Sequence, residues 1–225
     1  ASDVYKRQAL TSQQRTAAAQ ARGFFDKEII AVEIPQRKGE PVVVAKDEHP
    51  RASTTAEALA KLKPVVKADG TVTAGNASGI NDGAAALLIA SDEAVAQHGL
   101  KPRAKIIGST VVGVEPRIMG FGPAPAIKKL LAQTGLTLEQ MDVIELNEAF
   151  AAQALACTRD LGIEDGSEKV NPNGGAIALG HPLGASGARL VTTALNQLEQ
   201  TGGQYALCSM CIGVGQGIAL IIERV

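Results

Sequence analysis

The stretch at residues 171–187 constrains the fold of this chain more than any other. It reads N-P-N-G-G-A-I-A-L-G-H-P-L-G-A-S-G and carries no charge apart from the imidazole of His181. A solvated linker would be charged, whereas glycines let a backbone approach another group closely or adopt a positive φ. Pro182 biases the residue before it toward extended geometry. The stretch therefore predicts a tight, buried loop that presents one imidazole, and the apolar spacing after it predicts a helix that begins near Ser186.

Two further motifs accompany this histidine, which taken alone is most often hydrogen-bonded in a turn. Asn147 and Glu148 open the apolar run N-E-A-F-A-A-Q-A directly after a strand-like segment, and Cys211 begins C-I-G-V-G-Q-G near the carboxyl end. An amide, an imidazole and a thiol at strand ends or in glycine-rich loops can converge in an α/β fold. Together they can position water, stabilise an oxyanion and move a proton.

The remaining periodicity and turn signals predict alternating strands and helices. Helices are predicted over residues 9–22, 54–62, 91–99 and 123–135, with a further one opened by Asn147 and the last from Ser186. Strands are predicted over residues 28–35, 41–45, 84–90, 106–114, 142–146, 204–212 and 218–224. Alternation followed by a closing hairpin indicates an α/β protein with a mixed sheet.

The motifs N-E-A-F, G-H-P and C-x-G-x-G, in this order, resemble the carboxyl-terminal part of the thiolases (acetyl-CoA acyltransferases), and the similarity covers about residues 9–225. The runs D-E-H-P-R, V-E-P-R-I-M-G and V-N-P-N-G-G are most similar to the 3-oxoadipyl-CoA thiolases. That group acts in the β-ketoadipate pathway of aromatic compound degradation, and other thiolases act in fatty acid β-oxidation. The resemblance implies reversible Claisen cleavage, in which a 3-oxoacyl-CoA and CoA give acetyl-CoA and a shortened acyl-CoA.

The same resemblance implies an α/β thiolase-like fold, with two βαβαβαββ halves in a five-layer αβαβα arrangement, of which only the carboxyl-terminal half is complete here. Residues 9–75 would belong to a loop domain that covers CoA, 76–100 would end the amino-terminal half, and 101–225 would form the carboxyl-terminal domain. Residues 1–8 do not match the family and are treated as foreign or misread sequence. Thiolases carry their nucleophilic cysteine upstream of this region. The chain is therefore expected to be a fragment, inactive alone, whose missing partner is its own amino-terminal half and which is a homo-oligomer (dimer or tetramer) when complete.

Catalytic roles follow from the resemblance, residue by residue. His181 would activate the nucleophilic thiol and donate to the thioester oxygen, and Asn147 would hold a water in the same oxyanion hole. Cys211 would shuttle the proton of the acetyl α-carbon, and the backbone N–H of Gly213 would help form a second oxyanion site. These residue types suit the reaction because thiolates are good nucleophiles and two carbonyl oxygens must become anionic.

Substrate-binding roles are implied for four other residues. Ser78, in N-A-S-G, would touch the pantetheine arm of CoA, and Arg51 would lie near its nucleotide end. Met119 would lie against the acyl pocket, and Phe150 of N-E-A-F would also contact CoA or the substrate. For three of these residues an interpretation without ligand binding stays open. Ser78 could be an ordinary turn residue, Arg51 could be a solvated surface residue, and Met119 could pack in the core.

Other functions stay open beside the 3-oxoadipyl-CoA thiolase. One is a general acetyl-CoA acetyltransferase, and another is a non-catalytic member of the fold that binds acyl-CoA or lipid. A 3-oxoacyl synthase is disfavoured, because those enzymes usually have a histidine where Asn147 stands and lack a counterpart of Cys211. For a substrate that ends in a carboxylate, Arg117 is a candidate binding group, with a surface salt bridge as the alternative.

Composition excludes several classes. The 225 residues include 22 basic and 23 acidic ones, for a net charge of −1, so nothing favours nucleic acid or an anionic membrane. No apolar run reaches the ~18 residues of a membrane span, and no signal peptide is visible.

The three cysteines do not form a disulfide framework, so a reducing cytoplasm is the expected location. Cys157 is interpreted as a buried small hydrophobe. Cys208 and Cys211 would point to opposite faces of a strand, and no second pair exists to complete a zinc site. We therefore expect no metal, and no cofactor apart from coenzyme A as a substrate.

Overall fold

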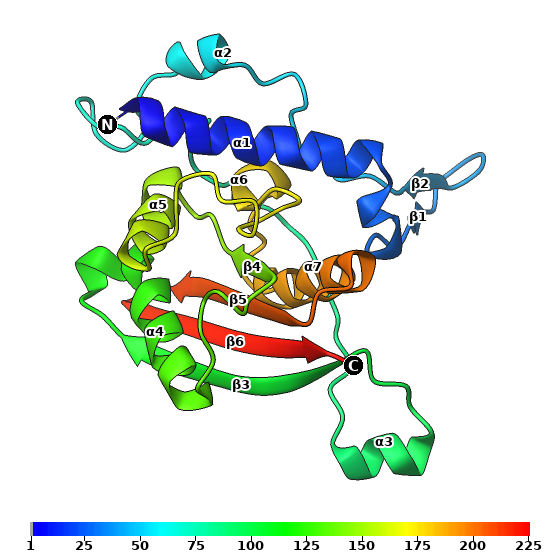
Figure 1. Cartoon of the computed structure of the whole chain (residues 1–225). Coiled ribbons are helices and arrows are strands. Elements are labelled where there is room, and N and C mark those ends of the chain that lie inside the picture. The colour runs from blue at the N-terminus through cyan, green and yellow to red at the C-terminus, as the bar shows by residue number, and fades with distance from the viewer. Residues whose placement is uncertain (1) are drawn as a thin grey trace.

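The computed structural model describes residues 2–225, with side chains from Asp3 onward (Figure 1). The α-helices are α1 (Ser2–Ala21), α2 (Ala56–Ala60), α3 (Asp92–His98), α4 (Pro123–Thr134), α5 (Ala151–Asp160), α6 (Ala176–Leu179) and α7 (Ser186–Thr201). Two 3-10 helices are η1 (Phe24–Lys27) and η2 (Pro116–Phe121). The strands are β1 (Val32–Ile34), β2 (Val42–Val44), β3 (Ala104–Gly113), β4 (Val143–Leu146), β5 (Tyr205–Ile212) and β6 (Gln216–Arg224).

A four-stranded mixed sheet organises residues 104–224, with strand order β3-β6-β5-β4. β4 runs parallel to β5, whereas β5–β6 and β6–β3 are antiparallel. Helix α7 covers one face of the sheet and α4 covers the other (Figure 1). The predicted α/β class with a mixed sheet is therefore confirmed, and so is the closing hairpin, whose second strand begins at Gln216 rather than at residue 218.

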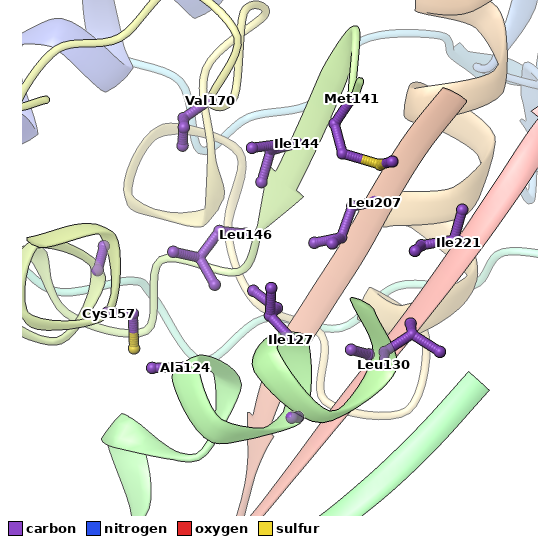
Figure 2. Close-up of a cluster of buried hydrophobic side chains, with 13 residues drawn as sticks. Ala124, Ile127, Leu130, Met141, Ile144, Leu146, Cys157, Val170, Leu207 and Ile221 are labelled. Carbon is purple, nitrogen blue, oxygen red and sulfur yellow. The ribbon is translucent and has the colours of Figure 1, made fainter. Parts of the chain in front are cut away.

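Two apolar clusters hold these layers together. On one face, Ile144 and Leu146 of β4 pack with Leu207 of β5, Ile221 of β6 and the buried side of α4 (Figure 2). On the other face, α7 packs its leucines onto Val143 and Cys208. Because successive strand residues face opposite sides, both faces of β4 and β5 are buried. Each large aliphatic side chain buried in this way contributes roughly 1.5–3 kcal/mol.

Helix α1 begins at Ser2, so the prediction that it starts at residue 9 is wrong. The extra turns are stabilised by tertiary contacts, because Tyr5 and Ala9 pack against Leu59, Ala151 and Ile177. Figure 1 shows α1 lying across α5 and α6, on the β4 side of the sheet.

The helices predicted over residues 91–99 and 123–135 are present as α3 and α4, and capping residues mark their ends. The hydroxyl of Ser91 accepts from the backbone N–H of Ala94 at the start of α3, and Gly99 ends that helix with φ 59°. Gly135, with φ 70°, ends α4 in the same way. The strands predicted over residues 28–35 and 41–45 and the helix predicted over residues 54–62 are present as β1, β2 and α2, each shorter than predicted.

A strand predicted over residues 84–90 is absent, and this prediction is wrong: the segment forms neither helix nor strand. A strand needs a neighbour for its backbone N–H and C=O groups, and within residues 2–225 no segment pairs with this one. Its apolar side chains are accordingly exposed, to 83% for Leu88 and 67% for Ile89.

The helix after β4 does not open at Asn147 as predicted but begins at Ala151. The intervening backbone pairs instead with the segment at residues 76–78. The N–H of Ser78 donates to the carbonyl of Ala149 (3.0 Å), and the N–H of Ala151 donates to that of Asn76 (2.9 Å). Extended backbone at Phe150, with φ −144° and ψ 145°, delays the helix.

The third strand that the family pattern implies, between α5 and α7, is reduced to one parallel bridge between Val170 and Ile144. Asn171 stops it with a left-handed φ of 46°. The side-chain amide of Asn171 replaces the lost backbone pairing, since it accepts from the N–H of Leu146 and donates to the carbonyl of Leu146, both at 2.8 Å. The start of the 171–187 stretch is thereby tied to the end of β4.

Candidate active site

Asn147 and Cys211 lie at one edge of the sheet. Asn147 directly follows β4, and its backbone N–H donates to the carbonyl of Ser209 in β5 at 3.0 Å. Cys211 stands two positions further along β5, near its carboxyl end. Because β4 and β5 are parallel, their carboxyl ends meet at the same edge.

His181 enters this edge from the loop between α6 and α7, where it is 9% exposed. Its Nε2 lies 3.4 Å from Nδ2 of Asn147, and its Nδ1 lies 2.6 Å from Oγ of Ser186. Burial, followed by the nearby cation of Arg189, lowers the pKa of His181 below its ordinary value of 6.5. The structure thus brings together the imidazole and the amide that the sequence placed 34 positions apart.

The amide of Asn147 is fully buried, and its Oδ1 finds no partner among the described residues. A buried carbonyl oxygen without a donor is costly, so this atom needs a water or a ligand group. The geometry therefore offers a polar position beside the imidazole of His181.

Cys211 is 5% exposed, and burial raises the pKa of its thiol above the ordinary value of 9.0, with an opposing contribution from its own backbone N–H. Gly213 follows in the exposed β5–β6 turn, in which Val214 has a left-handed φ of 68°. Cys208 packs under α7 on the other face of the sheet. Cys157 is buried in α5, as predicted, and burial raises its pKa to about 11. All three thiols are free.

The segment with Ser78 reaches the same edge. Ser78 and Phe150 are both half-buried, and the bridge between Ala77 and Phe150 fixes this segment beside the end of β4. The next residues also bind the histidine loop, because the backbone N–H of His181 lies 3.2 Å from the carbonyl of Gly79 and 3.2 Å from Oδ1 of Asn81.

Met119 and Arg51 occupy different surroundings. Met119 is half-buried in η2, which contacts β5 and β6. Arg51 is exposed, and its backbone N–H donates to Oε1 of Gln13 on α1 at 2.8 Å. Arg117 forms a surface salt bridge with Glu115 at 3.1 Å, and its side chain is 82% exposed. This is the alternative to a role in binding a substrate carboxylate.

Sequence reasoning missed four residues around His181. Ser186 was taken only as the start of a helix, and Asn81 was not singled out in N-A-S-G-I-N. Glu145 and Arg189 form an ion pair at 3.1 Å beneath the site, and burial raises the pKa of Glu145 to about 8 despite that pairing. The one available signal was a glutamate inside an otherwise apolar strand, because such a residue needs a partner when buried.

Within residues 2–225 no group of three His, Cys, Asp or Glu side chains is arranged to hold a metal ion. A surface hollow of about 590 Å³ lies between the loops at residues 138–139 and 161–169 and includes none of the candidate residues. None of the described helices combines the length and the apolar character needed to cross a membrane.

Comparison with models of known protein families shows the family to which this chain belongs. Residues 4–93 match the model of the thiolase N-terminal domain, and residues 100–224 match that of the thiolase C-terminal domain. This chain belongs to the thiolase family.

Thiolases that resemble the chain include a beta-ketoadipyl-CoA thiolase of Acinetobacter baylyi, 84% identical over 96% of this chain and 54% of the relative. The 3-oxoadipyl-CoA/3-oxo-5,6-dehydrosuberyl-CoA thiolase of Escherichia coli K12 is 58% identical over the same shares. The chain thus spans about half the length of the curated relatives it matches.

Solved thiolase structures share its fold. The acetyl-CoA acetyltransferase of Bacillus anthracis superposes with a TM-score of 0.95 at 46% identity, over all of this chain and 56% of that one. Human mitochondrial 3-ketoacyl-CoA thiolase in complex with CoA gives 0.90 at 45% identity, over all of this chain and 55% of that one. The thiolase-like fold that the motifs implied is confirmed by these similarities.

Proposed function

We propose that this chain supplies the acid and base groups of a thiolase site that cleaves 3-oxoacyl-CoA with CoA. The observation that carries the proposal is the contact of 3.4 Å between Nε2 of His181 and Nδ2 of Asn147, at the sheet edge where β5 brings Cys211. The proposal concerns the complete protein, since the chain spans 54% of its relatives.

In the first half-reaction, Nε2 of His181 takes the proton of a nucleophilic thiol, and the thiolate attacks the 3-oxo carbon of the substrate. The lowered pKa of His181 supports this role, because the ring is then neutral and able to accept a proton at neutral pH. The resulting oxyanion would be stabilised by the imidazolium and by a water held on Asn147. The buried, unpartnered Oδ1 of Asn147 supports the water position.

The carbon–carbon bond then breaks, and its electron pair passes to the α-carbon of the acetyl-CoA fragment. The thiol of Cys211 gives that carbon a proton. The raised pKa of Cys211 supports this role, because the thiol then stays protonated at neutral pH. The backbone N–H of Gly213 would stabilise the enolate oxygen of this fragment. The thiol proton of CoA then passes to the Cys211 thiolate, the CoA sulfur takes the acyl group from the nucleophile, and the released nucleophile recovers its proton from His181.

The nucleophile itself is proposed to lie outside this chain. Burial raises the pKa of Cys157 and of Cys208, whereas a nucleophilic cysteine needs a lowered pKa and access to its substrate. Cys211 is assigned to the acid/base step. The complete protein is proposed to be cytoplasmic and to work as a homo-oligomer (dimer or tetramer).

As substrate we propose 3-oxoadipyl-CoA, supported by the names of relatives 84% and 58% identical to this chain. Ser78, Phe150 and Met119 are proposed to line the pantetheine and acyl sites, with Arg51 toward the nucleotide. A general acetyl-CoA acetyltransferase is the second candidate, because an enzyme of that name from Chromobacterium violaceum is 54% identical.

The test uses a chimera, defined as the Acinetobacter baylyi thiolase in which the 217 aligned residues of this chain replace their counterparts. In the chimera, Cys211→Ser should lower turnover by roughly 10²-fold or more, since positioned acid/base groups contribute ~10²–10⁴-fold. Covalent acylation of the nucleophile, followed by mass spectrometry, should persist. Cys157→Ala, in a buried thiol with no proposed role, is the matched control. Near-normal turnover of the Cys211→Ser chimera would contradict the assignment.

A further inference from the structure

The hydroxyl of Ser186 holds the imidazole of His181. Its Oγ lies 2.6 Å from Nδ1 of the ring, and Ser186 is 2% exposed, so no bulk water competes for this contact. The same Oγ lies 3.0 Å from the carbonyl oxygen of Pro182. The two contacts together fix the direction of the hydrogen bonds.

A carbonyl oxygen can only accept, so the hydroxyl proton of Ser186 is directed to Pro182. The oxygen then has only lone pairs to offer to the ring, and Nδ1 must donate. In a neutral imidazole one nitrogen carries the proton and the other is an acceptor. Nε2 therefore holds the free lone pair, and it faces the N–H₂ group of Asn147, which can only donate. Both sides of the ring select the same tautomer.

We propose that Ser186 is a positioning residue that keeps His181 in the Nδ1–H tautomer, with the basic Nε2 directed into the site. This inference rests on the proposed role of His181 as the base. When Nε2 takes a proton, the bond from Nδ1–H to Ser186 stays in place, so the ring changes charge without rotating. A neutral hydroxyl, unlike a carboxylate, orients the ring without adding a charge that would raise its pKa.

The backbone around Ser186 is held independently of its hydroxyl. The N–H groups of Ala185 and Ser186 both donate to the carbonyl of Pro182 at 2.9 Å. Ser186→Ala is therefore expected to keep the start of α7 and to lose only the contact with the ring. Thr192→Ala is the matched control, because Oγ1 of Thr192 donates to the carbonyl four residues earlier, Ala188, at 3.0 Å on the same helix.

The first measurement is the imidazole ¹⁵N spectrum of this chain at a pH at which the ring is neutral. The resonances lost in a His181→Asn variant identify the ring among the three histidines. The unmodified chain and Thr192→Ala should show a protonated Nδ1 and an unprotonated Nε2, whereas Ser186→Ala should shift toward the Nε2–H tautomer. An Nε2–H tautomer in the unmodified chain, or the same spectrum in both variants, overturns the proposal.

The second measurement is kinetic and uses the chimera. It tests the positioning role of Ser186 even if the isolated chain gives no spectrum of a folded protein. Ser186→Ala should lower kcat by about tenfold or more, as expected for a lost hydrogen bond to a charged group, with KM nearly unchanged. A kcat equal to that of Thr192→Ala overturns the positioning role. An unmodified chimera that cleaves no 3-oxoacyl-CoA would instead defeat the proposed function, and the tautomer spectra would still decide this inference.

Discussion

Replacement of Gly217 by alanine tests how the strand that carries Cys211 is held. Gly217 is the cross-strand partner of Cys211 in β6. A Cβ at Gly217 would lie 2.7 Å from Cα of Gly122 and closer still to its carbonyl group, whereas real Cβ atoms essentially never come within 3.0 Å of another residue. The obstacle is backbone at the start of α4, so it cannot rotate away. The two backbones must separate by on the order of 1 Å, and overpacking of this kind costs ~1–3 kcal/mol or more.

We expect Gly217→Ala in the chimera to lose about 3 kcal/mol of unfolding free energy, measured by urea denaturation, because backbone opposes the new methyl group. Turnover should fall by roughly 10²-fold, since a displacement of ~1 Å at a reacting group can cost that much. Gly113→Ala is the matched control in the neighbouring strand β3, where a Cβ meets nothing within 4 Å. That variant should be unchanged or more stable by up to ~1 kcal/mol. Equal stability of the two variants would refute the close approach of β6 and α4.

Two further predictions use the chimera. The kcat/KM for 3-oxoadipyl-CoA should exceed that for acetoacetyl-CoA, and preference for the shorter neutral substrate would favour the general acetyltransferase. The acidic limb of the pH profile of kcat/KM should have its midpoint below 6.5, because burial and Arg189 favour the neutral form of His181, and protonation that removes the base occurs only at lower pH. An acidic midpoint at or above 6.5 would contradict that description of the site.

Local signals predicted those elements whose ends depend on capping. Ser91 and Gly99 mark α3, and Gly135 marks the end of α4, because these residues satisfy helix-end groups from within the sequence. The apolar stretch at residues 84–90 has the composition of a strand but no paired neighbour, and composition does not reveal whether a neighbour exists.

The motifs named candidate site residues, and their catalytic roles stay predictions, whereas the geometry around His181 could not be predicted from the sequence. His181, Asn147 and Cys211 were identified by motif, whereas the contact of Ser186 with the ring depends on the turn between Pro182 and α7. The delayed start of α5 has a similar cause, since residues 76–78 pair with the backbone around Phe150 over a long sequence separation. Such tertiary contacts override local propensity and leave no periodic signal.

The proposal that the nucleophile lies outside this chain is tested most directly by a CoA-dependent cleavage assay with 3-oxoadipyl-CoA. Three purified proteins are compared at equal concentration: the 225-residue chain, the chimera, and the chimera with His181→Asn. The chimera should turn over, His181→Asn should reduce its turnover by roughly 10²-fold or more, and the 225-residue chain should show no CoA-dependent cleavage. Cleavage by the 225-residue chain alone would contradict the account, because one of its own three cysteines would then have to be the nucleophile.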